Sequence, residues 1–123
     1  MKASVLFKQY VWLVDTIRRA GRAYHDADLV WNDLKIGQTL RLEREPQNPY
    51  DANAIQVIFN RDGEDFLLGY IPRSENAKLV AFLDAGWEEL FTCRISQLCP
   101  DAHSENQVQL TVRIRQNTKK KNN

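Results

Sequence analysis

The stretch IQVIFNRDGEDFLLGYI, residues 55–71, decides the fold class. Ile55, Val57 and Phe59 recur with a period of two, which is typical of a strand that buries one face. Residues 60–63 follow, and their Asp-Gly pair favours a tight hairpin turn because both residues tolerate a positive φ. Residues 66–71 then supply the partner strand. The sequence therefore predicts an antiparallel hairpin in the middle of the chain.

The same period extends to both sides of this hairpin. It predicts a strand at residues 39–43, a second at 91–95 and a third at 108–114, where apolar and polar residues alternate most regularly. So many short strands would present exposed edges unless the sheet closed on itself. With one well-formed helix among them, five or six short strands fit a small barrel better than a sandwich.

A helix is predicted directly after the hairpin. Pro72 ends the second strand, and Ser74 or Asn76 is positioned to cap a helix that runs to residue 84 before Gly86 stops it. Its predicted packing face consists of Ala77, Val80, Ala81 and either Leu83 or Asp84.

The N-terminal segment fits two structures. Leu6, Tyr10, Leu13, Val14 and Ile17 recur at helical spacing, yet residues 10–17 are also rich in the aromatic and β-branched residues of strands. Residues 28–34 predict a short helical turn. We therefore divide the chain into an N-terminal extension or first strand or helix (1–19), one domain (20–116) and a polar, basic tail expected to be disordered (117–123).

Composition limits the function classes. The chain has 123 residues, enough for one domain with a core, and its formal net charge is only +1. Because electrostatic affinity scales with the number of phosphates neutralised, such a chain cannot hold a long duplex by charge alone. Residues 1–7 lack the apolar core of a signal peptide, and no apolar run approaches the roughly 20 residues of a membrane span. We expect a cytoplasmic protein with no membrane partner.

Residues that could carry catalysis or a metal are sparse. Cys93 falls on the inward side of its predicted strand, and Cys93, Cys99 and His103 lack the close cysteine pair of zinc modules. His25 and His103 lie far apart, and no glycine-rich phosphate loop or nucleophile motif is present. We therefore expect no metal, no cofactor, no small-molecule substrate and no enzymatic activity. Trp31 and Trp87 are expected to be packing residues of the core.

The loop NPYDANAI, residues 48–55, carries the most informative chemistry. Pro49 and the preceding Pro46 stiffen it, and it holds the ring of Tyr50 next to the carboxylate of Asp51. An unpaired nucleobase with a free sugar hydroxyl would use both groups, one for stacking and one as a hydrogen-bond acceptor. Alternatively, Asp51 and Asn53 merely cap backbone amides of their own loop in Asx turns. The loop residues alone leave both interpretations open.

Two ordered motifs, REPQNPYDANAI at 44–55 and LGYIPR at 68–73, resemble the signature of the HIRAN family. The similarity covers about residues 20–114. It implies an OB-like six-stranded barrel with two short α-helices that recognises the 3′-hydroxyl end of single-stranded DNA. Members of the family are often attached to helicases or nucleases that act in DNA repair and at stalled replication forks.

The resemblance also implies a role for individual residues. Tyr50 would stack on the terminal base, Asp51 would bind the 3′-hydroxyl, and Asn48 would line the same pocket. Tyr70 and Arg73 occupy positions that contact the strand, with Arg73 meeting a phosphate.

Beside a second aromatic position, the sequence departs from the family pattern. Tyr24 matches the second stacking residue, but the preceding position, often an arginine in end-binding members, is Ala23 here. Arg22 or Arg19 would have to compensate.

Two functions remain. The first is a module that binds the 3′ end of single-stranded DNA, with micromolar affinity, shallow salt dependence and a helicase or nuclease as partner. The second is a protein-interaction adaptor that uses the same pocket for a peptide or a partner's chain. A sugar hydroxyl needs Asp51 and a phosphate needs Arg73, whereas a peptide cleft more often has a continuous apolar groove.

Overall fold

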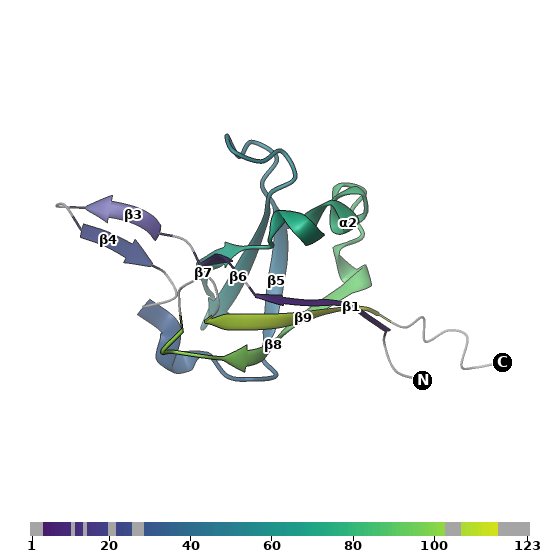
Figure 1. Cartoon of the computed structure of the whole chain (residues 1–123). Coiled ribbons are helices and arrows are strands. Elements are labelled where there is room, and N and C mark those ends of the chain that lie inside the picture. Colours follow the sequence, from purple (N-terminus) through teal and green to yellow (C-terminus); the bar gives the residue numbers. More distant parts are fainter. Residues whose placement is uncertain are drawn as a thin grey trace.

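The protein is mainly β, and the part of it that the structure describes has one seven-stranded antiparallel sheet, a separate two-stranded hairpin and the α-helix α2 (Figure 1). The strand order in the main sheet is β1-β9-β8-β5-β6-β7-β2. The computed structural model describes residues 4–10, 12–13, 15–19, 22–25, 29–102 and 107–115. For residues 4, 6, 9, 10, 12–13, 15–19 and 22–25 it describes only the backbone.

The strands of the main sheet are β1 (Ser4–Tyr10), β2 (Trp12–Leu13), β5 (Thr39–Arg44), β6 (Ile55–Arg61), β7 (Glu64–Tyr70), β8 (Phe91–Leu98) and β9 (Val108–Ile114). The separate hairpin consists of β3 (Asp15–Arg19) and β4 (Arg22–His25). The helices are α2 (Arg73–Asp84) and the short 3-10 helices η1 (Trp31–Asp33) and η2 (Glu88–Leu90).

The predicted central hairpin is confirmed as β6–β7. Arg61 pairs with Glu64 across the turn, and the two residues between them have positive φ, 54° at Asp62 and 90° at Gly63. Two successive positive φ values are typical of a type I′ turn, whose twist matches that of the strands. The side chain of Asn60 accepts a hydrogen bond from the Gly63 amide at 3.2 Å and stabilises the turn.

A single hydrophobic cluster lies on one face of the main sheet. Six strands contribute inward side chains to it, so the sheet must curl around the cluster. The predicted period of two is confirmed in the buried residues Leu40, Ile55, Val57, Phe59, Phe91, Cys93, Ile95, Val108, Leu110 and Val112.

The closed six-stranded OB-like barrel is not confirmed. In the hydrogen-bonded order, β1 and β2 are the two edges of an open sheet. These two strands are consecutive in the chain, but β2 pairs with β7 at only two residues, Trp12 with Tyr70 and Leu13 with Gly69.

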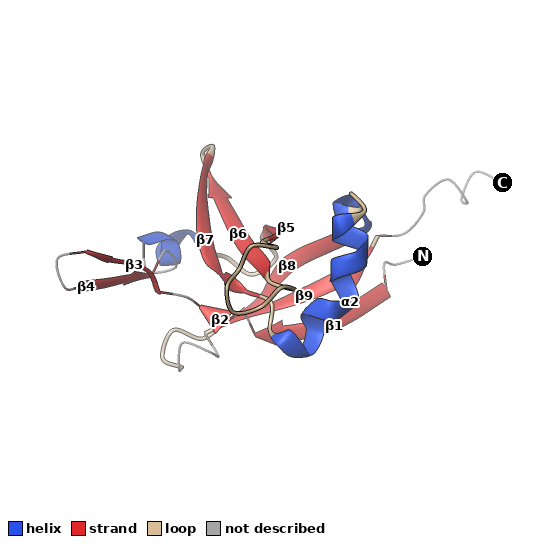
Figure 2. Cartoon of the chain, turned by 90° about the horizontal axis from the view of Figure 1, so that it is seen from above, coloured by secondary structure: helices blue, strands red, loops and turns tan. Residues whose placement is uncertain are grey.

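Helix α2 lies beside the main sheet (Figure 2), where it contacts β5 and where Lys78 Nζ lies 5.9 Å from the centre of the Phe7 ring of β1. It begins at Arg73, and its N-cap is Pro72, without a side-chain cap, two residues before the predicted Ser74 and four before Asn76. The predicted packing face is confirmed at Leu83, which is buried, and at Val80, which packs against the core. It is wrong at Ala77 and Ala81, which are exposed, and Leu79 is buried instead. The longer side chains remove more apolar area from water, which favours the leucine face. Among the described helices, none is long and apolar enough to cross a membrane.

Two segments for which the sequence left alternatives are now described. The described part of residues 4–19 is extended, as β1, β2 and β3. Leu29 and Val30 form a helical turn that leads into η1, where Trp31 is half-buried against the core. Trp87, expected in the core, is instead 62% exposed, because it lies in the surface connection between α2 and β8.

Candidate nucleic-acid interface

A cavity of about 230 Å³ opens between the loop that joins β5 to β6, the end of β7 and the start of α2. Its lining brings together five residues that the sequence singled out, although they come from three separate elements. The lining residues are Asn48, Tyr50, Asp51, Ala54, Tyr70, Ile71 and Arg73.

The loop is held by its own side chains, as one of the two interpretations of the sequence expected. Asn48 Oδ1 accepts hydrogen bonds from the backbone amides of Tyr50 at 2.8 Å and Asp51 at 3.0 Å. Asp51 Oδ1 accepts another from the amide of Asn53 at 2.9 Å. These Asx turns fix the direction of the Tyr50 and Asp51 side chains, so capping and ligand binding are compatible.

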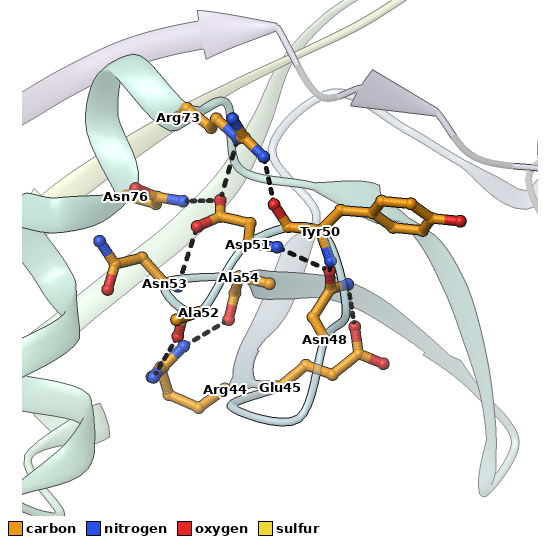
Figure 3. Close-up of polar contacts among 10 residues, drawn as sticks. All are labelled: Arg44, Glu45, Asn48, Tyr50, Asp51, Ala52, Asn53, Ala54, Arg73 and Asn76. Atoms are coloured by element: carbon orange, nitrogen blue, oxygen red, sulfur yellow. Dashed lines mark hydrogen bonds and ion pairs between the residues drawn. The ribbon is translucent and has the colours of Figure 1, made fainter.

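Arg44, at the end of β5, connects this loop to the rest of the molecule (Figure 3). Its guanidinium donates to the carbonyl oxygens of Ala54 at 2.7 Å and Ala52 at 2.9 Å. It also donates to Asp84, the last residue of α2, at 2.8 Å. The arginine that opens the 44–55 motif therefore has a structural role in this protein.

The second oxygen of Asp51 faces the start of α2. Asn76 donates to Asp51 Oδ2 at 2.8 Å, and Arg73 Nε lies 3.6 Å from the same oxygen. Arg73 also donates to the carbonyl oxygen of Tyr50 (Figure 3). Asn76 is only 2% exposed, so it acts as a buried positioning residue for Asp51. The sequence had suggested Asn76 merely as a helix cap.

The Tyr50 ring points away from these polar contacts (Figure 3). The residue is 84% exposed, an unusual position for a large aromatic side chain. Its backbone is fixed on both sides, by Asn48 at the amide and by Arg73 at the carbonyl. The protein thus presents a free aromatic face on a rigid loop.

The other aromatic of the cavity, Tyr70, is half-buried and donates its hydroxyl to Glu45 Oε1 at 2.6 Å. Burial and this hydrogen bond raise the pKa of Tyr70 to about 12. Burial pushes the pKa of Glu45 upward, but hydrogen bonds from Tyr70, Asn48 and Gln56 outweigh it and hold that pKa below its ordinary value. Glu45 therefore carries a negative charge beneath the cavity at neutral pH.

This pair predicts a fall in stability at alkaline pH. Between about pH 10 and 12 the unfolded chain releases the Tyr70 proton while the folded protein keeps it, so the free energy of unfolding falls as pH rises. Replacing Tyr70 with phenylalanine should flatten this slope, as measured by urea denaturation from pH 9 to 12. Tyr50→Phe is the control, and an equal change of slope in both variants would contradict the assignment to Tyr70.

The model of the HIRAN domain matches residues 17–117. The chain belongs to the HIRAN family. Two curated relatives are named Fanconi-associated nuclease 1 homolog. That of Oryza sativa subsp. japonica is 33% identical over 81 residues, 66% of this chain and 8% of the relative. That of Arabidopsis thaliana is 38% identical over 64 residues, 52% of this chain and 6% of the relative.

This HIRAN domain thus spans less than a tenth of the length of these relatives. Among solved structures, a crystal structure of a protein from Lactobacillus plantarum superimposes with a TM-score of 0.63 at 24% identity. The match covers 94% of this chain and 98% of that one, and it shows that the two share a fold.

The remaining predicted contacts of the HIRAN domain lie on the separate hairpin. Tyr24 in β4 pairs with Ile17 in β3, and Arg22 pairs with Arg19. The hairpin projects away from the main sheet (Figure 1). The side chains of Tyr24 and Arg22 lie outside the described residues, so their contacts with a ligand stay predictions. Ala23, the position that resembles the family's frequent arginine, pairs with Arg18.

Metal-binding residues do not gather in the part of the chain that the structure describes. There, no three His, Cys, Asp or Glu side chains lie close enough to hold an ion. Burial raises the pKa of the Cys93 thiol to about 12, so it stays protonated in the core. The side chains of His25 and His103 are outside the described residues.

Proposed function

We propose that this HIRAN domain binds the 3′-hydroxyl end of single-stranded DNA. The observation that carries the proposal is the exposed ring of Tyr50 next to the fixed carboxylate of Asp51, at a cavity of about 230 Å³. A terminal base would stack on Tyr50, and the terminal sugar hydroxyl would donate to Asp51. Stacking on an aromatic side chain contributes roughly 1–3 kcal/mol per base, without preference for sequence.

Asp51 has the capacity for one more donor. Its two oxygens face three groups, the Asn53 amide, the Asn76 side chain and Arg73. A carboxylate offers about four acceptor sites, so one is left for a hydroxyl. The Asp51 side chain is 22% exposed, which keeps that site within reach of solvent and ligand.

Charge favours a hydroxyl over a phosphate at the terminus. Asp51 and Glu45 are both acidic and would repel a terminal phosphate. The Arg73 side chain is 63% exposed at the rim and would meet the phosphate that precedes the terminal nucleotide. A footprint of two or three nucleotides with few phosphates implies micromolar affinity and shallow salt dependence.

We also infer the setting in which this binding acts. End binding performs no reaction, so a partner enzyme, a helicase or a nuclease of DNA repair, would supply it in the cytoplasm. The names of the curated relatives support a link to a nuclease. Residues 20–116 would be the binding unit. Strands β1 and β2 would complete an OB-like closure, because β1 pairs with β9 and β2 pairs with β7.

Fluorescence anisotropy on short labelled strands tests the proposal. The strands end in a 3′-hydroxyl, a 2′,3′-dideoxynucleotide, a 3′-phosphate or a duplexed 3′ end. We expect preference for the 3′-hydroxyl, and a loss of about tenfold or more in Tyr50→Ala from the missing stacking. Asp51→Ala should bind the hydroxyl and dideoxy ends equally. Tyr50→Phe is the matched control, because it keeps the ring and should bind like the wild type.

Equal or absent binding to all four strands would overturn the proposal. The adaptor function would then be the better account of the same cavity, since Ala54 and Ile71 give it an apolar part that an extended peptide could contact.

A further inference from the structure

A second concave surface lies on the outward face of β8 and β9, away from the strands that form the end pocket. It is a groove of about 480 Å³. Outward residues of neighbouring strands share this face because cross-strand partners point to the same side of a sheet. Thr111 of β9 pairs with Arg94 of β8 and with Lys8 of β1. Arg113 of β9 pairs with Thr92 of β8.

The groove presents donors without carboxylates. Arg94 and Arg113 bring guanidinium groups to it, and Thr92 brings a hydroxyl group. Of the other two hydroxyl side chains in the lining, Ser96 donates to Gln109 Oε1 at 3.0 Å and Thr111 is only 6% exposed. Arg94 and Arg113 are diagonal neighbours across the two strands, which places their Cβ atoms about 7–8 Å apart. No acidic residue is among those that line the groove.

The charges of the described side chains are segregated around this face. Five cations form ion pairs with carboxylates: Arg41, Arg44, Arg61, Arg73 and Lys78. The cations without a carboxylate within 4 Å among the described residues are Lys8, Lys35, Arg94, Arg113 and Arg115. Lys8, Arg94 and Arg113 lie on β1, β8 and β9, while Lys35 directly precedes the groove's Ile36 and Arg115 directly follows β9. Although the net charge of the chain is only +1, these cations make the described surface around the groove basic.

Arg94 keeps most of its donors free. Its single hydrogen bond among the described residues is a long one, 3.4 Å to the carbonyl oxygen of Gly37. Arg113 has no side-chain hydrogen bond or ion pair among the described residues. Two guanidinium groups with free N–H donors suit phosphate oxygens, which accept several hydrogen bonds at once.

We propose that this groove binds the phosphate backbone of a single-stranded nucleic acid, as a site distinct from the end pocket. The proposal rests on the proposed function, because the end pocket holds the last nucleotides and the rest of the strand needs a separate contact. The groove has no aromatic residue in its lining, so it contacts the backbone and does not stack on bases.

The test separates the two sites by the ligand used. A circular single strand of about 30 nucleotides has no end and reports on the groove, whereas a strand of four nucleotides with a 3′-hydroxyl reports on the end pocket. The test variant is Arg94→Gln/Arg113→Gln. The control is Arg41→Gln/Arg61→Gln, which removes the same charge from paired, half-exposed arginines elsewhere.

The test variant should bind the circle about tenfold more weakly at low salt, with a slope of log affinity against log salt that is smaller by about 1.4, or 0.7 for each phosphate contact. Its binding of the short strand should be unchanged. The control should match the wild type on both ligands, and Tyr50→Ala should lose the short strand but keep most of the circle.

The proposed phosphate site would be overturned if the wild type does not bind the circle, or if the test variant binds it with the affinity and salt slope of the wild type. It would also be overturned if the control variant loses as much affinity for the circle as the test variant, or if polyglutamate competes as effectively as unlabelled circle. A wild type that binds the circle but not the short strand would overturn the end pocket and leave the groove standing.

Discussion

Replacing Arg44 with methionine should lower the free energy of unfolding by about 3 kcal/mol, because two charge-assisted hydrogen bonds to the backbone are lost. The Arg44 side chain is only 12% exposed, and its guanidinium contacts the carbonyl oxygens of Ala52 and Ala54 as well as Asp84. Methionine keeps the apolar stem in place, so the loss reports on the guanidinium. Urea denaturation at pH 7 measures it.

Arg41→Met is the matched control, since Arg41 lies on the same strand and is also ion-paired. It contacts Asp65 and Glu43 at the surface, with about half of its side chain exposed. Exposed pairs contribute about 1 kcal/mol or less, so the control should be nearly as stable as the wild type. Arg44→Lys should lose most of the stability too, because one ammonium cannot reach all three acceptors. Equal losses at positions 41 and 44 would contradict the structural role of Arg44.

The strands were predictable because their pattern is local. Alternation at residues 55–59 and the Asp-Gly pair at 62–63 set the strand faces and the turn without help from distant residues. The residues of the 48–51 loop were predictable as a group for the same reason, and the similarity to the HIRAN family placed Tyr70 and Arg73 near them.

Features that depend on tertiary neighbours were not predictable. The helix face was misassigned at Ala77 and Ala81 because alanines and leucines on α2 both fit a helical period, and only the position of the core decides between them. Trp87 was assigned to the core from its residue type, yet the α2–β8 connection carries it over the surface.

The polar contacts of the site also depend on tertiary neighbours and were not predictable. Glu45 pairs with Tyr70, and Asn76 with Asp51, each across 25 positions of sequence. The buried asparagine did leave one signal, because Asn76 lies on the face of α2 that Leu79 and Leu83 share. A polar residue on a buried stripe needs a partner, and that requirement could have directed the search to Asp51.

Replacing Asn76 with aspartate should have the largest effect, a loss of about 4 kcal/mol at pH 7, because the new carboxyl beside Asp51 has to stay protonated in the folded state at a pH where the unfolded chain ionises it. Asn76 donates to Asp51 Oδ2 at 2.8 Å, and two carboxylates at that distance cannot both be ionised. The folded variant therefore keeps a proton that the unfolded chain releases near about pH 4. Since the folded state then binds more protons, the stability of the variant falls as pH rises above that value.

Ser74→Asp is the control, because it adds the same charge at an exposed position in the first turn of α2, where a negative charge is mildly favourable. Urea denaturation at pH 4 and pH 7 should show Asn76→Asp losing most of its stability between the two values relative to this control. A variant that matches Ser74→Asp at both pH values would show that Asn76 does not position Asp51.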